Sequence, residues 1–78
     1  MTITAPLELR FGHLTWIESA KAGDSAWFSH WRQYRLRARP LTPTRWVVSH
    51  ETPEGWMLIG SAPSLGGVSA VAEEWVMK

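Results

Sequence analysis

The chain has 78 residues, of which 45% are hydrophobic and 19% charged, with no cysteine and a formal net charge of +1. This composition excludes a disordered chain, a disulfide framework and a thiolate metal site, and the length leaves room for one domain with one core. The N-terminus lacks a secretory signal pattern, and no apolar run reaches the roughly 20 residues of a membrane helix. We therefore expect a single cytoplasmic domain over residues 1–78, with residues 1–6 as a candidate disordered segment.

Alternating apolar and polar residues occur in short runs separated by turn-forming residues, which is the pattern of an antiparallel sheet. The first run, 7–11, is predicted as a strand or an extended arm, and 14–18 continues it with Gly12 as a candidate bulge. Residues 20–25 are typical of a loop. The next two strands are predicted at 26–31 and 34–39, joined by a tight turn at the short polar link 32–33.

Two prolines and a second hairpin pattern follow these strands. Pro40 and Pro43 each lack the N–H that a sheet ladder needs, so residues 40–44 are predicted to interrupt the sheet. Residues 45–50 and 56–60 are predicted to form a hairpin. The intervening Thr52-Pro53-Glu54-Gly55 fits a type I turn, which favours proline at its second position and glycine at its fourth.

The C-terminal residues change to a helical period. One side of a helix over about 65–77 collects the apolar residues Leu65, Val68, Val71, Ala72, Trp75 and Val76. Ser64 is the predicted N-cap, and Gly66 and Gly67 weaken the first turn, so the helix needs packing against the sheet. The predicted fold class is α+β: an antiparallel four- to five-stranded β-meander with one C-terminal helix packed on one face.

Six residues are tryptophan, and each can bury about 150–250 Å². Trp46, Trp56 and Trp75 are predicted to form a core between sheet and helix, and Trp16 is expected to join them. Trp27 and Trp31 share a strand face and lie next to the most basic part of the chain. Whether these two belong to the core or to the surface stays open.

Charge is distributed unevenly, because residues 32–45 contain five arginines and no acidic residue. Strand alternation places Arg35, Arg37 and Arg39 on one face, roughly 6.5–7 Å apart along the strand. Three interpretations of this row stay open. The arginines form a solvated face and pair with carboxylates, they contact a protein partner, or they bind the phosphates of a nucleic acid. The candidate partner-binding residues are Arg35, Arg37, Arg39, Trp27, Trp31, Phe28 and Arg32.

Catalytic, metal and cofactor motifs are not evident in the sequence. His13, His30 and His50 are the residues of a conceivable three-histidine zinc site, but no spacing motif links them. Glu73 and Glu74 are neighbours on the predicted helix and point apart, and the glycines before that helix lack the pattern of a phosphate loop. We expect no catalytic residues, no metal, no cofactor and no enzymatic activity.

The second half of the chain has a recognisable order of motifs: Arg45-Trp46-Val47-Val48, then Gly55-Trp56-Met57-Leu58-Ile59-Gly60, then Ser64-Leu65 and a helix rich in alanine and glutamate. With the preceding strands, this order resembles small uncharacterised proteins of actinobacteria and their phages. Over residues 34–77 the architecture is also similar to the sheet-plus-helix DNA-binding domains of the integrase arm-binding and plant ethylene-response types. The resemblance implies a small accessory or regulatory protein, and in the DNA-binding families the arginine row would be the reading surface.

We therefore expect a small non-catalytic binding or regulatory protein that engages a partner protein through an arginine-rich, aromatic sheet face. Modulation of a host protein would be the role if the protein comes from a phage. The alternative is a nucleic-acid-binding domain that uses the face of Arg35, Arg37 and Arg39. A homodimer that covers the surplus aromatic side chains is a third expectation, and no membrane association is expected.

Overall fold

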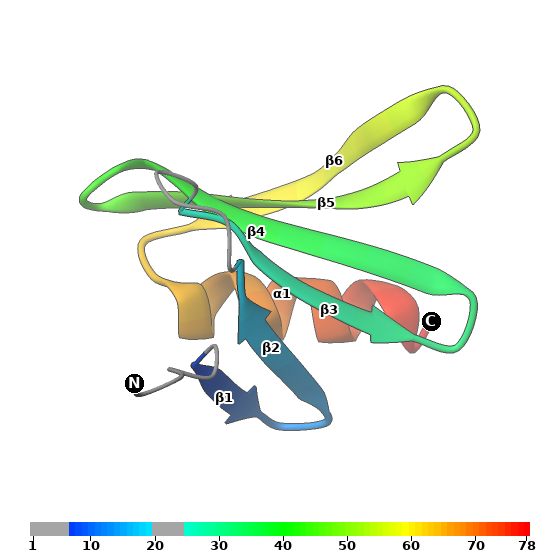
Figure 1. The fold of residues 1–78 in the computed structure, drawn as a ribbon, viewed down its shortest axis with the longest axis horizontal. Helices are drawn as coiled ribbons and strands as arrows, with labels where there is room; N and C mark the ends of the chain where they lie inside the picture. Colours follow the sequence, from blue (N-terminus) through cyan, green and yellow to red (C-terminus); the bar gives the residue numbers. More distant parts are fainter. Residues whose placement is uncertain (1–6, 20–24) are drawn as a thin grey trace, which may run out of the picture.

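The computed structural model describes residues 7–19 and 25–78, and within them six strands are followed by one helix (Figure 1). The elements are β1 (Glu8–Phe11), β2 (Leu14–Glu18), β3 (Trp27–Trp31), β4 (Tyr34–Thr42), β5 (Arg45–Thr52), β6 (Gly55–Ala62) and α1 (Leu65–Val76). Each strand pairs antiparallel with the next, in the order β1-β2-β3-β4-β5-β6. The predicted α+β fold with an antiparallel sheet and a C-terminal helix is confirmed, but the sheet has six strands, not four to five. The predicted disordered segment 1–6 and most of the predicted loop 20–25 lie outside the described residues.

The additional strand arises at Gly12, which lies in a turn and not in the predicted bulge. Phe11 pairs directly with Leu14, so Gly12 and His13 form the two-residue connection of a β1–β2 hairpin. Gly12 has a φ of +62°, which glycine adopts at no steric cost and which primed hairpin turns require. The same turn contacts α1, because the His13 amide donates a hydrogen bond to the Glu73 carboxylate.

The prediction that residues 40–44 interrupt the sheet is wrong at Pro40. β4 continues through this residue, which pairs with Trp46 of β5. β3 begins at Trp27, opposite Ala38, so beyond Ala38 the strand β4 has β5 as its only strand neighbour among the described residues. Proline is tolerated at such an edge position because no ladder needs its missing N–H there.

Two predicted hairpin connections are confirmed. Arg32 and Gln33 form the turn between β3 and β4, with Arg32 at a φ of +54°. Thr52 pairs with Gly55 at the β5–β6 turn, and its hydroxyl donates to the Gly55 carbonyl at 2.8 Å and accepts from the Glu54 amide at 3.2 Å. The β5–β6 hairpin projects beyond the rest of the sheet, at the upper right of Figure 1.

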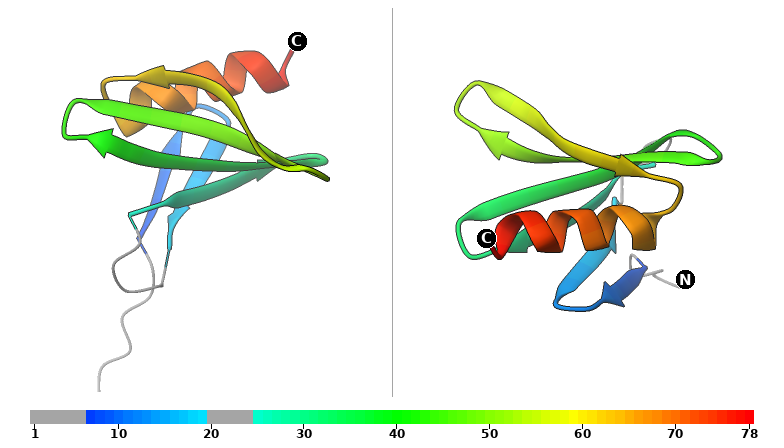
Figure 2. Two further views of the ribbon diagram at one scale, coloured as in Figure 1. Left: turned by 90° about the horizontal axis from the view of Figure 1, so that it is seen from above. Right: turned by 180° about the vertical axis from the view of Figure 1, so that it is seen from behind.

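The helix lies across one face of the sheet, and the sheet curls around it so that both edge strands contact it (Figure 2). Trp16 is fully buried there, and its Nε1–H donates a hydrogen bond of 2.8 Å to Ser69 Oγ on α1. This bond satisfies a polar group that would otherwise be buried without a partner. The core between sheet and helix consists of Leu14, Trp16, Leu36, Ala38, Val48, Leu65, Val68, Ala72 and Val76.

The helix begins where the sequence predicts it. Ser64 is the N-cap, and its hydroxyl accepts a hydrogen bond of 3.0 Å from the Gly67 amide. α1 approaches β6 closely, because a Cβ at Gly60 would lie only 2.7 Å from Val71 Cγ1. In the part of the chain that the structure describes, no helix is long and apolar enough to cross a membrane.

Candidate functional site on the open face of the sheet

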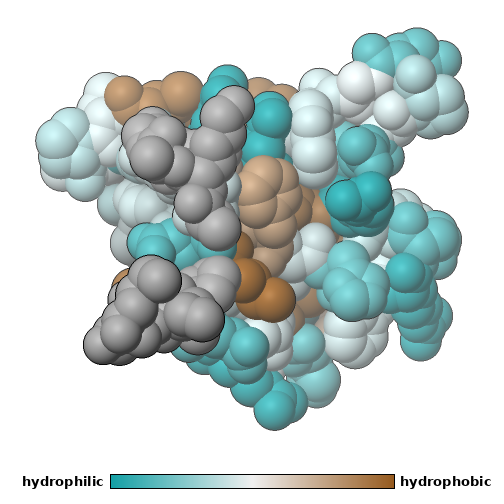
Figure 3. Space-filling model, in the orientation of Figure 1, coloured by the Kyte–Doolittle hydropathy of each residue, from teal (hydrophilic) through white to brown (hydrophobic). Residues whose placement is uncertain are grey.

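The face of the sheet opposite α1, called the open face below, is the candidate site. Strand pairing places one line of side chains across five strands on this face: Ile17, Phe28, Arg37, Ser49 and Leu58, in the order β2 to β6. Figure 3 views this side of the molecule, where hydrophobic atoms are exposed near the centre between hydrophilic side chains. Helix packing therefore covers one face of the sheet and leaves a mixed apolar and basic surface on the other.

An aromatic platform forms the centre of the open face. The Arg37 guanidinium carbon lies 4.5 Å from the centroid of the Trp56 ring, within the range of a cation–π contact. The Phe28 ring lies beside the same indole, with ring centroids 6.3 Å apart. We call these three side chains the platform. They come from β3, β4 and β6, so only the folded sheet brings them together.

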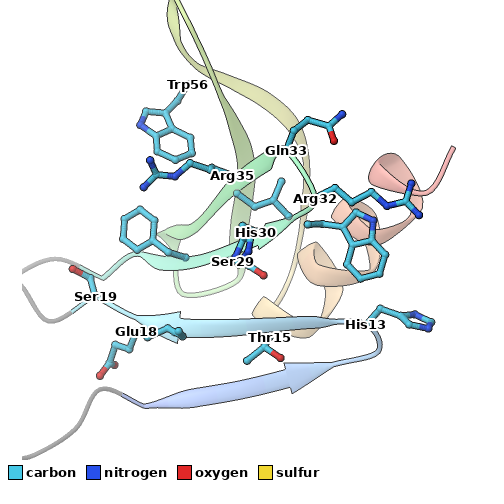
Figure 4. A pocket seen from close by; sticks show the side chains of 14 residues that line it. His13, Thr15, Glu18, Ser19, Ser29, His30, Arg32, Gln33, Arg35 and Trp56 are labelled. Atoms are coloured by element: carbon cyan, nitrogen blue, oxygen red, sulfur yellow. The ribbon is translucent and has the colours of Figure 1, made fainter.

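A cavity adjoins the platform because β2 and β3 diverge. Their ladder contains two residue pairs, Ile17 with Phe28 and Glu18 with Trp27, although each strand has five residues. The resulting cavity has a volume of about 1140 Å³ and extends from the gap between these strands to the platform (Figure 4). The Ser29 hydroxyl oxygen is buried in its lining and has no hydrogen-bond partner among the described residues.

The lining of this cavity combines aromatic, cationic and hydrogen-bonding side chains from β2, β3, β4 and β6. Besides Ser29, the lining includes His13, Thr15, His30, Trp31, Arg32, Arg35 and Trp56. Such a surface can pack against an apolar group and hold a carboxylate or phosphate with its guanidinium groups. An unpaired hydroxyl in the lining can also donate to or accept from an occupant.

The structure divides the predicted partner-binding residues between two surfaces. Arg35, Arg37, Arg39 and Phe28 lie on the open face, and Arg35 forms an ion pair of 3.3 Å with Glu51. Arg39 is exposed at the other end of the row.

The other three predicted residues lie elsewhere. Trp27 and Trp31 point to the helix side, where both are half-buried and pack against the core. Arg32 lies in the β3–β4 turn, with its guanidinium 5.9 Å from the Trp31 ring centroid, at the rim of the cavity. The prediction that both tryptophans lie with the arginine row is therefore correct only in part: Trp31 lines the cavity next to Arg32, and Trp27 does not line it.

Trp56 belongs to the candidate site, although the sequence pattern predicts it in the core. Its position follows from the β5–β6 turn: Thr52 pairs with Gly55, so Trp56 lies opposite Glu51 and shares its face. Glu51 in turn contacts Arg35 on the open face. The turn residues were visible in the sequence, and counting the register outward from them would have placed this tryptophan correctly.

The three histidines are not brought together. His13 lies at the β1–β2 turn beside Glu73, at 3.4 Å between Nδ1 and Oε1. His30 is exposed on the open face, whereas His50 lies on the helix side with its ring centroid 4.5 Å from that of Trp75. Within residues 7–19 and 25–78, no group of three or more metal-binding side chains is placed to hold an ion.

Comparison with models of known protein families, with curated proteins and with solved structures gave no match. The resemblance to small actinobacterial and phage proteins therefore stays a prediction. What the open face does must be inferred from its own geometry.

Proposed function

We propose that this protein is a small non-catalytic binding protein whose open face engages a protein partner. The observation that carries the proposal is the exposed platform and its apolar surroundings. Phe28 keeps 37% of its surface exposed although Trp56 and Arg37 lie beside it, and Ile17, its pairing partner on β2, keeps 46%. Tryptophan and arginine are the residue types enriched at protein-binding hot spots, and exposed contiguous apolar patches mark interaction sites.

The charges on this face favour a partner segment that carries both carboxylates and an apolar side chain. Arg35 and Arg39 are exposed on either side of the platform, so a bound carboxylate can replace or join the Glu51 partner of Arg35. The apolar side chain would occupy the cavity beside the platform. A regulatory role follows if this contact covers a functional surface of the partner.

Affinity capture with two matched double variants tests the proposal. Phe28→Ser/Arg35→Glu removes one exposed apolar side chain and reverses one charge on the open face. Met77→Ser/Lys78→Glu makes the same kinds of change at exposed positions at the end of α1, on the other side of the sheet. We expect the first variant to lose a nuclease-resistant partner that wild type and the control both retain. Equal retention by all three proteins would contradict the use of the open face.

Nucleic-acid binding is the second candidate, and the platform itself favours it. An indole and a phenyl ring beside a row of arginines can stack bases while the guanidinium groups contact phosphates. Against it, Glu51 lies on the open face and Glu18 lines the cavity, and both carboxylates would repel a phosphate chain. The test is binding of a labelled single-stranded oligonucleotide at increasing salt. Phosphate contacts predict a steep loss of affinity, whereas no binding at low salt would remove this candidate.

A further inference from the structure

The two edges of the sheet differ in length and in charge. The outer strand β1 has four residues and carries Glu8 and Arg10. The outer strand β6 has eight residues, Gly55–Ala62, and none of them is charged or proline. Short, charged edge strands prevent pairing with other chains, whereas long uncharged edges favour it.

The side chains along β6 are exposed as well as uncharged. Met57 is 55% and Leu58 67% exposed, and Leu58 lies on the open face. Among the described residues, β5 is the only strand that pairs with β6, so the backbone groups on its outer side have no strand partner. Figures 1 and 2 show this edge on the projecting hairpin, where a second chain can approach it.

We propose that β6 pairs antiparallel with β6 of a second copy of this chain, so that two sheets join into one in a homodimer. The charges at the ends of the strand set this direction. Glu54 directly precedes β6, and Arg45 lies beside its last residues, with Nη1 donating to Ser61 Oγ at 3.4 Å. Antiparallel pairing brings Glu54 of each copy near Arg45 of the other, whereas parallel pairing would bring the two glutamates together.

The strand β6 contains one irregularity, which the dimer must accommodate. Ser49 pairs with Leu58 and Val48 with Gly60, so Ile59 is an extra residue without a partner on β5. Bulges of this kind disturb edge pairing locally. In the antiparallel dimer both bulges lie at the two-fold axis, and the regular segments on either side pair with each other.

The dimer would also enlarge the open face. A two-fold axis perpendicular to the joined sheet places the open faces of both copies on the same side. Leu58 of one copy then lies next to Leu58 of the other, close to the two-fold axis. This inference does not depend on the identity of the partner that the open face binds, because its test measures the mass of the protein alone.

Sedimentation equilibrium of the full chain tests the proposal. We expect wild type to sediment at twice its 8.8 kDa at tens to hundreds of micromolar. Leu58→Lys places like charges near the two-fold axis and should raise the dimer Kd about tenfold or more. Leu41→Lys is the matched control, since Leu41 is 59% exposed but lies near the end of β4, outside β6, and it should dimerise as wild type does. A monomeric wild type over this range, or equal behaviour of the two variants, would overturn the proposal.

The direction of pairing has its own test. Glu54→Arg should weaken the dimer several-fold because it faces Arg45 of the other copy, and Glu54→Arg/Arg45→Glu should restore it. Circular dichroism checks that each variant keeps its fold. If Glu54→Arg leaves the dimer unchanged, or if the double variant gives no rescue, the antiparallel alignment is wrong.

Discussion

The two faces of the sheet use the same residue types for different purposes. On the helix side, Trp16 is fully buried and its polar atom is paired with Ser69. On the open face, Trp56 lies under a guanidinium group beside the exposed Phe28. A tryptophan in this chain therefore stabilises the fold or offers a contact surface according to the face it occupies, and strand register decides which.

The helix side contains most of the large aromatic side chains. Around the buried core, Trp27, Trp31, Trp46 and Trp75 are half-buried and pack against it. A domain of this size buries only about 60% of its unfolded surface, so large side chains at the margin of the core add stability that a small core alone does not give. Trp56 is outside this set, which makes it the tryptophan best placed for a role in binding.

Truncation of one tryptophan on each face gives the largest expected difference. Trp16→Ala should lower the free energy of unfolding by about 3–5 kcal/mol, because it removes a fully buried side chain and its bond to Ser69. Trp56→Ala, the same chemical change on the open face, should cost about 1 kcal/mol or less, mostly the loss of its contact with Arg37. Urea denaturation followed by circular dichroism measures both. Similar losses would show that the open face is as important for stability as the core.

Tight packing on the helix side predicts a second difference. Gly60→Ala should destabilise the protein by about 1–3 kcal/mol, because the new Cβ would meet Val71 Cγ1 at 2.7 Å. Adding Val71→Ala should recover part of that loss. Ser61→Ala, the next residue on β6, is exposed and should change stability by less than about 0.5 kcal/mol. Equal unfolding free energies for the Gly60 and Ser61 variants would mean that α1 can shift freely over β6.

Local signals in the sequence predicted those parts of the fold that local interactions determine. The β5–β6 hairpin follows from its turn residues, and the start of α1 follows from Ser64. Gly12 was misassigned because a glycine between two alternating runs fits both a bulge and a two-residue turn. Pro40 was misassigned because the rule against proline in a sheet depends on neighbouring strands, and the early end of the β3–β4 ladder was not visible in the sequence.

The candidate site was predictable in part. The alternation of β4 places Arg35, Arg37 and Arg39 on one face, and the structure agrees. The cavity was not predictable, because it exists where β2 and β3 separate after two residue pairs. Alternation within each strand predicts which side chains share a face, but the distance between two strands depends on the twist of the whole sheet and on the packing of α1.

Because α1 creates the difference between the two faces, its first turn offers a moderate test. Ser64→Ala should cost about 1 kcal/mol, since the Gly67 amide loses the hydroxyl that accepts its hydrogen bond. Ser64→Thr keeps an accepting hydroxyl and should lose less. Hydrogen exchange of the α1 amides reports where the effect arises. A loss of protection confined to β2 and β3 would show that the Ser64 cap does not determine the stability of α1.

The smallest expected effect concerns the ion pair on the open face. Arg35 and Glu51 lie 3.3 Å apart, but their side chains are 72% and 43% exposed, so water and salt screen their attraction. A double-mutant cycle with Arg35→Ala and Glu51→Ala should give a coupling energy below about 0.5 kcal/mol that decreases further at high salt. Such a weak pair leaves Arg35 free to exchange its carboxylate for one on a partner at little cost. A coupling energy above about 1 kcal/mol would instead show that the ion pair stabilises the fold. Arg35 would then not be available to bind a carboxylate of a partner.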